Sequence, residues 1–386
     1  REMGRSRQGS PRRNQLSLPA TRYRNPPAAM PSDAPSLSSA LDNIGLDALA
    51  ARLKQDLQCL GLPPRPWMIE RLHEDRPVLD VAIIGGGQAG LAAAVGLCHQ
   101  GIRTVVFDRS PKDFEGPWAT TARMETLRSP KELVGPAMGL PALTFRAWFL
   151  AQFGQSAWAA LDKIPRLQWM DYLRWYRNVM AVDVRNDCRV TGILPRADDM
   201  VQLSLQTAEG AQQLLARRVV VATGRDGLGG PALPAFVKGL PRHLWAHSSD
   251  AMDYHALAGQ RVVVVGAGSS AMDSAGTALE CGAARVDLLI RRPDLPRINK
   301  SKAAGVAGLT PGHWDLPDAE KWRLRHYINA QQVPPPHGST LRVARHSNAF
   351  FHFSSPVLSA EPLESGLRIH TPRGQVDADF LIVSTG

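Results

Sequence analysis

A glycine-rich turn between an apolar strand pattern and an alanine-rich helix pattern constrains the fold of this chain more than any other feature. Residues 80–91 have the sequence DVAIIGGGQAGL, in which Gly85, Gly87 and Gly90 give the spacing GxGxxG. The first glycine permits a tight turn, the second lets a pyrophosphate approach the backbone, and the third lets the helix pack close to the strand. The free N–H groups and positive dipole end of the helix then face the phosphates. The motif predicts a Rossmann-type βαβ unit that either binds a dinucleotide or is an ordinary turn without a ligand.

The residues that follow the turn favour the dinucleotide. A second apolar strand pattern at residues 104–107 ends in Asp108, at about the 20-residue spacing where an acid accepts hydrogen bonds from ribose hydroxyls. We therefore expect a first cofactor site built from Gly85, Gly87, Gln88, Ala89, Gly90, Asp108 and Arg109.

The same pattern occurs a second time. Residues 261–271, RVVVVGAGSSA, form a strand, a GxGxxA turn and a helix start, and the next strand pattern ends in Arg291-Arg292 instead of an acid. Each turn is followed later by an apolar strand that ends in Thr-Gly, at Thr223-Gly224 and at Thr385-Gly386. This internal duplication predicts a second dinucleotide site, formed by Gly266, Gly268, Ser269, Ser270, Ala271, Arg291 and Arg292, with Thr223, Gly224, Thr385 and Gly386 as further cofactor-binding candidates.

The charges at the two ribose positions differ in sign. An acid suits the free ribose hydroxyls of FAD and repels a 2′-phosphate, whereas an arginine pair attracts the 2′-phosphate of NADPH. We therefore expect FAD at the first turn and NADPH at the second. The alternative for Arg291-Arg292 is a solvated surface pair. Arg297, Asn299, Lys300 and Lys302 follow, and we favour a solvated loop there over a site for an acidic substrate.

These motifs together resemble the class B flavoprotein monooxygenases. The resemblance rests on the two turns, the two strand-Thr-Gly units and Gly116-Pro117-Trp118. Residues 124–131 (METLRSPK), 163–166 (KIPR) and 169–173 (WMDYL) resemble more closely a bacterial group related to flavin-dependent urate hydroxylase and a nitrosuccinate-forming aspartate monooxygenase.

The resemblance implies an NADPH- and O₂-dependent FAD monooxygenase. Such an enzyme hydroxylates a small polar metabolite through a flavin C4a-hydroperoxide, and N-hydroxylation of an amino acid is a candidate reaction. Trp118 would lie near the flavin ring and Thr223 at the crossover between domains. The flavin would carry the chemistry, and His247, near the nicotinamide, is the candidate catalytic residue. Core packing of Trp118 and a structural role for His247 are the alternatives. Two other functions stay open, an NADPH oxidoreductase or oxidase without oxygen transfer and a non-catalytic dinucleotide-binding protein.

The predicted fold class is α/β, with two Rossmann-like domains, the second inserted in the first, and a disordered N-terminal segment. A stripe of leucines predicts a helix over residues 46–60, an aromatic-rich helical stretch covers 145–180, and short strands of a meander are expected from Arg189 to Leu215. The expected parts are a leader (1–37), a helical appendage (38–77), the FAD domain (78–230), the NADPH domain (231–380) and the start of a return to the FAD domain (381–386). From the family pattern we expect the enzyme's chain to continue beyond Gly386.

Composition excludes several other classes of protein. The net charge is +10 over 386 residues, but seven arginines lie in the first 24 residues, so we infer no nucleic-acid partner. Cys59, Cys98, Cys188 and Cys281 form no CxxC pair, which disfavours a redox disulfide and a zinc site and fits the cytoplasm. We predict no metal and no membrane segment. The expected partners are O₂ and a small-molecule substrate, and a homo-oligomer stays open.

Overall fold

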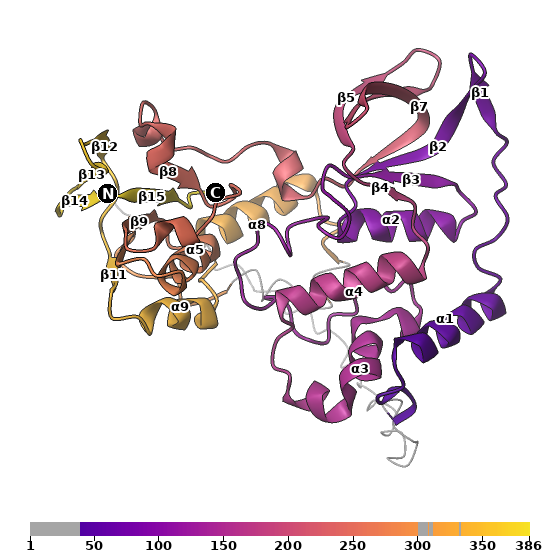
Figure 1. Ribbon diagram of the computed structural model, residues 1–386, viewed down its shortest axis with the longest axis horizontal. Coiled ribbons are helices and arrows are strands. Elements are labelled where there is room, and N and C mark those ends of the chain that lie inside the picture. Colours follow the sequence, from indigo (N-terminus) through magenta and orange to yellow (C-terminus); the bar gives the residue numbers. More distant parts are fainter. Residues whose placement is uncertain (1–38, 300–307, 309–311, 332) are drawn as a thin grey trace, which may run out of the picture.

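The computed structural model describes residues 39–299, 308, 312–331 and 333–386, and the predicted leader at 1–37 lies outside the described residues. Figure 1 shows two lobes, the first with the indigo-to-magenta elements and the second with the orange-to-yellow elements. Each lobe contains one sheet with parallel strands and a glycine turn at the end of a central strand. The predicted α/β fold with two Rossmann-like units is confirmed.

The first lobe is built on a 7-stranded sheet in the order β4-β3-β2-β7-β6-β5, with β1 paired to β2. Its strands are β1 (Arg71–His73), β2 (Arg76–Ile84), β3 (Thr104–Phe107), β4 (Val184–Arg185), β5 (Arg189–Pro195), β6 (Val201–Thr207) and β7 (Gly210–Val221). β4, β3, β2 and β7 run parallel, and β5, β6 and β7 form the predicted antiparallel meander.

β7 is one strand where the sequence pattern predicts two. Its residue Ala216 pairs with Val201 of β6 in antiparallel fashion and with Leu79 of β2 in parallel fashion. The last meander strand and the strand before Thr223-Gly224 are therefore one 12-residue strand. The predicted boundary at residue 77 also falls inside a strand, because residues 71–77 contain β1 and the start of β2.

The α-helices of the first lobe carry its largest buried side chains. They are α1 (Leu46–Leu60), α2 (Gln88–Cys98), α3 (Phe145–Ala160) and α4 (Arg166–Val179). α2 packs against the strands, and α4, α3 and α1 lie beyond it (Figure 1). The predicted bounds of α1 are confirmed. Phe145 and Trp169 are fully buried with ring centroids 5.5 Å apart, so most aromatic residues of this stretch pack in the core as expected, whereas Phe153 is exposed. Gly154, with φ 74°, interrupts α3.

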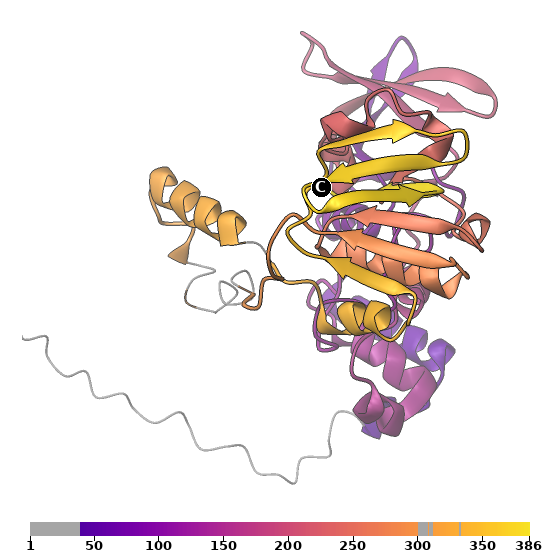
Figure 2. The same ribbon diagram turned by 90° about the vertical axis from the view of Figure 1, so that its left-hand side faces the viewer.

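The second lobe is built on a 5-stranded parallel sheet in the order β11-β10-β9-β15-β8, and a 3-stranded antiparallel sheet adjoins it (Figure 2). The strands are β8 (Trp245–His247), β9 (Arg261–Val265), β10 (Arg285–Leu289), β11 (Ala349–His352), β12 (Ser359–Pro362), β13 (Leu367–Thr371), β14 (Gly374–Ala378) and β15 (Phe380–Val383). The helices are α5 (Ser269–Glu280), α8 (Asp318–Gln331) and α9 (His337–Ala344).

β15 lies inside the second sheet, between β9 and β8. Leu381, Ile382 and Val383 are fully buried there. The boundary that the sequence predicts at residue 380 therefore falls inside a strand, because these apolar residues complete the core of the second lobe. Insertion of the second unit in the first stays a prediction.

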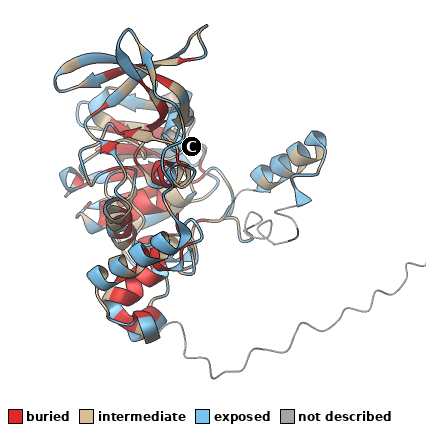
Figure 3. Ribbon diagram, turned by 90° about the vertical axis from the view of Figure 1, so that its right-hand side faces the viewer, coloured by how far each residue is buried: buried red, intermediate tan, exposed pale blue. Residues whose placement is uncertain are grey.

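Short 3-10 helices connect the main elements. They are η1 (Ser39–Leu41), η2 (Pro141–Leu143), η3 (Arg225–Leu228), η4 (Ala235–Val237), η5 (Arg242–Leu244) and η6 (His255–Leu257). Figure 3 shows the buried residues gathered at the sheets and the helices that cover them, whereas α8 carries no buried residue.

The buried Asp287 carboxylate of β10 contacts a histidine of β11, and this contact predicts how the stability of the fold depends on pH. The Asp287 carboxylate accepts a hydrogen bond from Arg285 Nε at 2.6 Å and lies 2.6 Å from His352 Nε2. Burial raises the pKa of Asp287, but the hydrogen bonds from Arg285 and His352 outweigh it, so the net shift of the pKa is downward.

We expect Asp287→Asn to reduce the free energy of unfolding at pH 7 by about 1–3 kcal/mol. A carboxylate whose folded pKa is depressed stabilises the fold above its unfolded pKa of about 3.9 and loses that contribution as pH falls through the folded value. The difference in the free energy of unfolding between wild type and variant, measured by urea unfolding, should therefore become smaller below about pH 4. The exposed Asp199 pairs with Arg218, and Asp199→Asn should change little. If Asp287→Asn reduced the free energy of unfolding equally at pH 7 and at pH 3.5, the Asp287 carboxylate would not be the stabilising group.

Candidate functional site

The first glycine turn connects β2 to α2 and requires glycine at two positions. Gly85 has φ 105°, and a Cβ added there would lie 2.5 Å from the carbonyl oxygen of Ala222. A Cβ added at Gly90 would lie 1.8 Å from the carbonyl oxygen of Gly85. The close approach of helix and strand expected from the sequence is therefore present at Gly90.

Gly90→Ala should lower the free energy of unfolding by about 3 kcal/mol, because the methyl group overlaps a backbone carbonyl that side-chain rotation cannot move. Gly96 lies in the same helix, and its added Cβ would lie 3.7 Å from the Met138 sulfur, an ordinary contact with a flexible side chain. Gly96→Ala is therefore the matched control and should be neutral or stabilising by up to about 1 kcal/mol. Urea unfolding of both variants measures the difference, and a Gly90→Ala midpoint equal to that of the wild type would refute the close approach.

The two strand-turn-helix units, which repeat in the sequence, also make equivalent backbone contacts. Ala222 N donates to Ile84 O at 2.8 Å in the first lobe, and Ser384 N donates to Val265 O at 2.9 Å in the second. A Cβ added at Gly266, with φ 137°, would lie 2.6 Å from the carbonyl oxygen of Ser384. In both lobes the segment before Thr-Gly therefore packs against the first glycine of the turn.

Both turns have open space at the second glycine. Among the described residues, and apart from the chain neighbours, no atom lies within 4 Å of a Cβ added at Gly268, and the nearest atom to one added at Gly87 is Gly116 Cα at 3.6 Å. Gly87 and Gly268 are the N-caps of α2 and α5, and neither cap has a side-chain hydrogen bond. Backbone N–H groups at an open helix N-terminus suit a pyrophosphate, so the residues present fit a dinucleotide at each turn.

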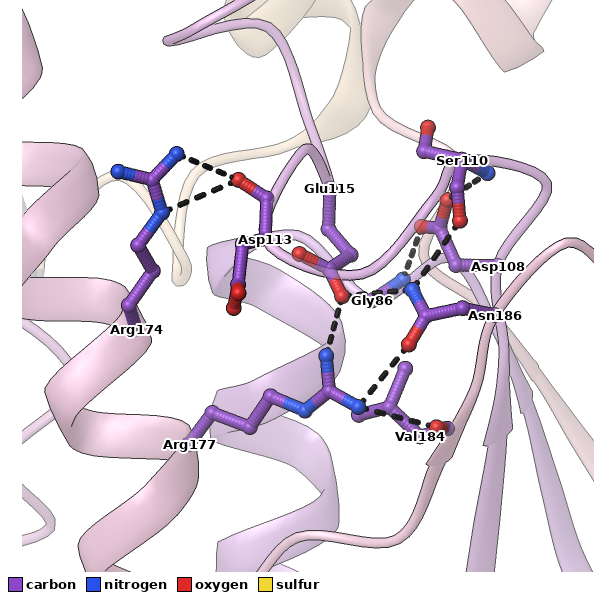
Figure 4. Close-up of polar contacts among 9 residues, drawn as sticks. All are labelled: Gly86, Asp108, Ser110, Asp113, Glu115, Arg174, Arg177, Val184 and Asn186. Carbon is purple, nitrogen blue, oxygen red and sulfur yellow. Dashed lines mark hydrogen bonds and ion pairs between the residues drawn. The ribbon is translucent and has the colours of Figure 1, made fainter.

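Asp108 lies directly beside the first turn, as Figure 4 shows. The Asp108 carboxylate accepts hydrogen bonds from Gly86 N at 2.6 Å and from Ser110 N at 2.7 Å. Each carboxylate oxygen can accept a further bond, so Asp108 both fixes the turn and keeps acceptor capacity for a ribose hydroxyl.

A buried network next to Asp108 was not found from the sequence. The Glu115 carboxylate accepts hydrogen bonds from Arg177 Nη1 and from Asn186 Nδ2, and Arg177 Nη2 also donates to Val184 O at 3.0 Å (Figure 4). A Cβ added at Gly86 would lie 3.2 Å from Glu115 Cγ. The network therefore supports the middle of the glycine turn. The one sequence feature that points to this network is the position of Glu115 directly before Gly116-Pro117-Trp118.

A large cavity joins residues of the two lobes. Its volume is about 1120 Å³, and its lining includes the predicted residues Arg109, His247, Gly266, Gly268, Ser269, Ser270, Arg291, Arg292, Thr385 and Gly386. Arg128 and Arg225 also line it, and no acidic residue is among the described lining residues. The cavity is therefore strongly basic, which suits an anionic dinucleotide.

The remaining predicted residues lie outside this lining. Gln88, Ala89 and Asp108 stay at the first turn, and the Gln88 side chain accepts a hydrogen bond from Trp169 Nε1 at 3.1 Å. Trp118 is half-buried against the first core. Ala271 is buried under the second turn. Thr223 and Gly224 are exposed after β7.

His247 ends β8 and is buried at the cavity. Its Nδ1 lies 2.7 Å from Ser249 Oγ and accepts a hydrogen bond from Ser249 N at 3.2 Å, which assigns the ring proton of the neutral form to Nε2.

Arg297 is exposed and pairs with Asp294, in keeping with the solvated loop predicted after Arg292. Lys300 and Lys302 lie outside the described residues.

Across residues 39–299, 308, 312–331 and 333–386, no group of three His, Cys, Asp or Glu side chains could hold a metal ion. Within the same ranges, no helix has both the length and the apolar surface needed to cross a membrane.

The comparisons with known proteins identify the family. The FAD-dependent urate hydroxylase of Xanthomonas campestris pv. campestris is 41% identical over 345 residues, which cover 89% of this chain and 72% of the relative. The chain belongs to the class B flavoprotein monooxygenases. An FAD-binding domain family matches residues 78–133, and the L-lysine 6-monooxygenase/L-ornithine 5-monooxygenase family matches residues 148–313 of this class B monooxygenase. The predicted family and its predicted cofactor FAD are confirmed.

Solved structures share the fold of this monooxygenase. The ornithine N-hydroxylase of Kutzneria sp. 744, solved with reduced FAD, NADP⁺ and L-ornithine, superposes with a TM-score of 0.66 at 19% identity, covering 80% of this chain and 81% of that one. The ornithine hydroxylase of Pseudomonas aeruginosa gives a TM-score of 0.66 at 18% identity, covering 80% of this chain and 82% of that one.

Proposed function

We propose that this flavoprotein uses NADPH and O₂ to hydroxylate a small polar metabolite. The observation that carries the proposal is the basic cavity of about 1120 Å³, which brings Arg109 and Arg128 of the first lobe to the second glycine turn. Hydride transfer requires the nicotinamide and the flavin to reach one space. The shared cavity, lined by residues of both lobes, extends from the second turn to Arg109, which follows Asp108, and would supply that space, although the glycines of the first turn are not among its described lining residues.

The residues of each turn suit different dinucleotides. At the first turn, the backbone around Gly85, Gly87, Gln88, Ala89 and Gly90 would hold the FAD pyrophosphate, and Asp108 would accept from its ribose. At the second turn, the N-terminus of α5 would hold the NADPH pyrophosphate, and Arg291 and Arg292 would bind the 2′-phosphate. Bound FAD supplies the redox chemistry and the reaction with O₂.

The protein then orients the reactants and excludes water. Trp118, half-buried on the loop after Gly116, is proposed to face the flavin. His247, buried at the cavity wall, is proposed to lie near the nicotinamide, and its hydrogen bond from Ser249 N would fix the ring orientation. Thr223 and Gly224 would mark the crossover between the domains.

Two reactions are candidates for the hydroxylation. N-hydroxylation of an amino acid is our prediction from the sequence, and the solved ornithine N-hydroxylase shares the fold. Oxidation of urate is the second candidate, because the urate hydroxylase of Xanthomonas campestris is 41% identical to this chain.

NADPH consumption against a panel of urate, ornithine, lysine and aspartate tests the proposal, with hydrogen peroxide release measured in parallel. We expect one substrate to accelerate NADPH oxidation and to lower the peroxide released per NADPH. NADPH oxidation with full conversion of O₂ to peroxide for every substrate would favour an oxidase, and a protein that binds no FAD would favour a non-catalytic role. A cytoplasmic location stays a proposal, and a homo-oligomer stays open.

A further inference from the structure

Residues 118–131, which run from Trp118 to the end of the METLRSPK motif (124–131), are the bridging segment between the two lobes. The first lobe fixes this segment through two backbone groups and one side chain of the segment. Arg166 Nη1 donates to Trp118 O at 2.5 Å, Leu127 N donates to Ile164 O at 2.7 Å, and Lys131 Nζ donates to Leu161 O at 2.6 Å. The bridging segment is therefore an ordered part of the first lobe.

The same bridging segment contacts the second lobe at three points. Arg128 Nη2 donates to Asp273 Oδ2 at 3.0 Å. The carbonyl oxygen of Arg123 accepts a hydrogen bond from Arg342 Nη1 at 2.9 Å. The Arg123 guanidinium lies over the Tyr254 ring, 5.2 Å from its centroid. Among these contacts, the pair formed by Arg128 and Asp273 joins opposite charges across the lobes.

Asp273 lies in α5, the helix whose N-terminus forms the second glycine turn. Its side chain is only 4% exposed, and its Oδ1 accepts a hydrogen bond from Ser339 Oγ of α9 at 2.8 Å. A buried carboxylate needs a charged partner to offset its lost hydration. Arg128 supplies that charge from the other lobe, and Arg128 also lines the shared cavity.

We propose that the Arg128–Asp273 pair is a positioning contact that fixes the NADPH site against the flavin site. The inference rests on the proposed function, because it takes NADPH as the ligand of the second turn. Since Asp273 belongs to the helix that would hold the pyrophosphate, loss of the pair frees α5 to shift relative to the bridging segment. The pair therefore controls how tightly NADP⁺ is retained and how well hydride transfer is coupled to hydroxylation.

Calorimetric titration of NADP⁺ into the full, FAD-loaded chain tests the inference. Arg128→Met and Asp273→Asn should each weaken NADP⁺ binding by up to about tenfold, because the helix that would hold the pyrophosphate loses one charge-assisted hydrogen bond to the other lobe. Arg128→Lys keeps the charge and should recover part of the affinity. The double variant should bind no more weakly than the weaker single variant, because both changes remove the same contact. Peroxide released per NADPH should rise in the variants.

Asp287→Asn is the matched control, because the Asp287 side chain is also only 4% exposed but pairs within the second lobe. It should lower thermal stability and leave NADP⁺ affinity unchanged. Wild-type affinity in both Arg128→Met and Asp273→Asn, or losses that multiply in the double variant, would overturn the inference. Wild-type protein that binds FAD but no NADP⁺ would instead overturn the proposed function, and this inference with it.

Discussion

The Gly87→Val variant should fold and purify without flavin. Gly87 has an extended backbone, with φ −69° and ψ −177°, that valine adopts readily. Its added Cβ would lie 3.6 Å from Gly116 Cα and 3.9 Å from Gly116 N, which is ordinary van der Waals contact. The valine side chain would fill the space proposed for the FAD pyrophosphate, so that two or more charge-assisted hydrogen bonds are lost. At about 1.5–3 kcal/mol each, FAD affinity should fall by roughly 100-fold to 10,000-fold.

Flavin absorbance of the purified protein and FAD titration of the apoprotein measure this loss. Circular dichroism should show the wild-type fold in the variant. Gly338 lies in the first turn of α9 and also faces open space, so Gly338→Val adds the same side chain away from the cavity and should keep its flavin. Full yellow flavin content in Gly87→Val would place the FAD site elsewhere.

Replacing both Arg291 and Arg292 by alanine should remove the preference for NADPH over NADH. Both arginines line the shared cavity close to the second turn. Two charge-assisted contacts to a 2′-phosphate, at about 1.5–3 kcal/mol each, correspond to a loss of roughly 100-fold to 10,000-fold in kcat/KM for NADPH. The value for NADH should stay nearly constant, because NADH lacks the phosphate.

Steady-state kinetics with the two nicotinamides measure the ratio, and single variants separate the exposed Arg291 from the half-buried Arg292. Arg297→Ala is the control, because Arg297 is exposed and paired with Asp294. An unchanged ratio of NADPH to NADH efficiency in the double variant would move the 2′-phosphate site away from β10.

Local sequence patterns were sufficient for the elements that form the two turns. The leucine stripe predicts α1 with its observed ends, and the two strand-turn-helix patterns predict β2-α2 and β9-α5. These patterns succeed because strand alternation, glycine conformations and helix periodicity act over a few residues. Such patterns do not predict the three-residue strand β8 or the continuity of β7. The ends of both strands are set by pairing with strands that are distant in the sequence.

The polar networks of the site could not be predicted in the same way. Glu115, Arg177 and Asn186 come from three separate parts of the first lobe, and Arg128 reaches Asp273 across 145 positions of sequence. Such pairs form only after the chain has folded, since nothing in the local spacing of a lone arginine or acid indicates its partner. By contrast, Asp108 was predictable because the βαβ unit fixes the end of β3 beside the turn.

Oxygen-isotope labelling of the product tests the central claim most directly. The full chain, loaded with FAD and supplied with NADPH and the best substrate of the panel, would react under ¹⁸O₂, and the product mass would be compared with NADPH consumed. We predict a product that carries one ¹⁸O atom per molecule, formed in proportion to NADPH oxidised, since a monooxygenase transfers one atom of O₂ to its substrate. NADPH oxidation with all ¹⁸O recovered as hydrogen peroxide or water, and an unlabelled substrate, would contradict the assignment.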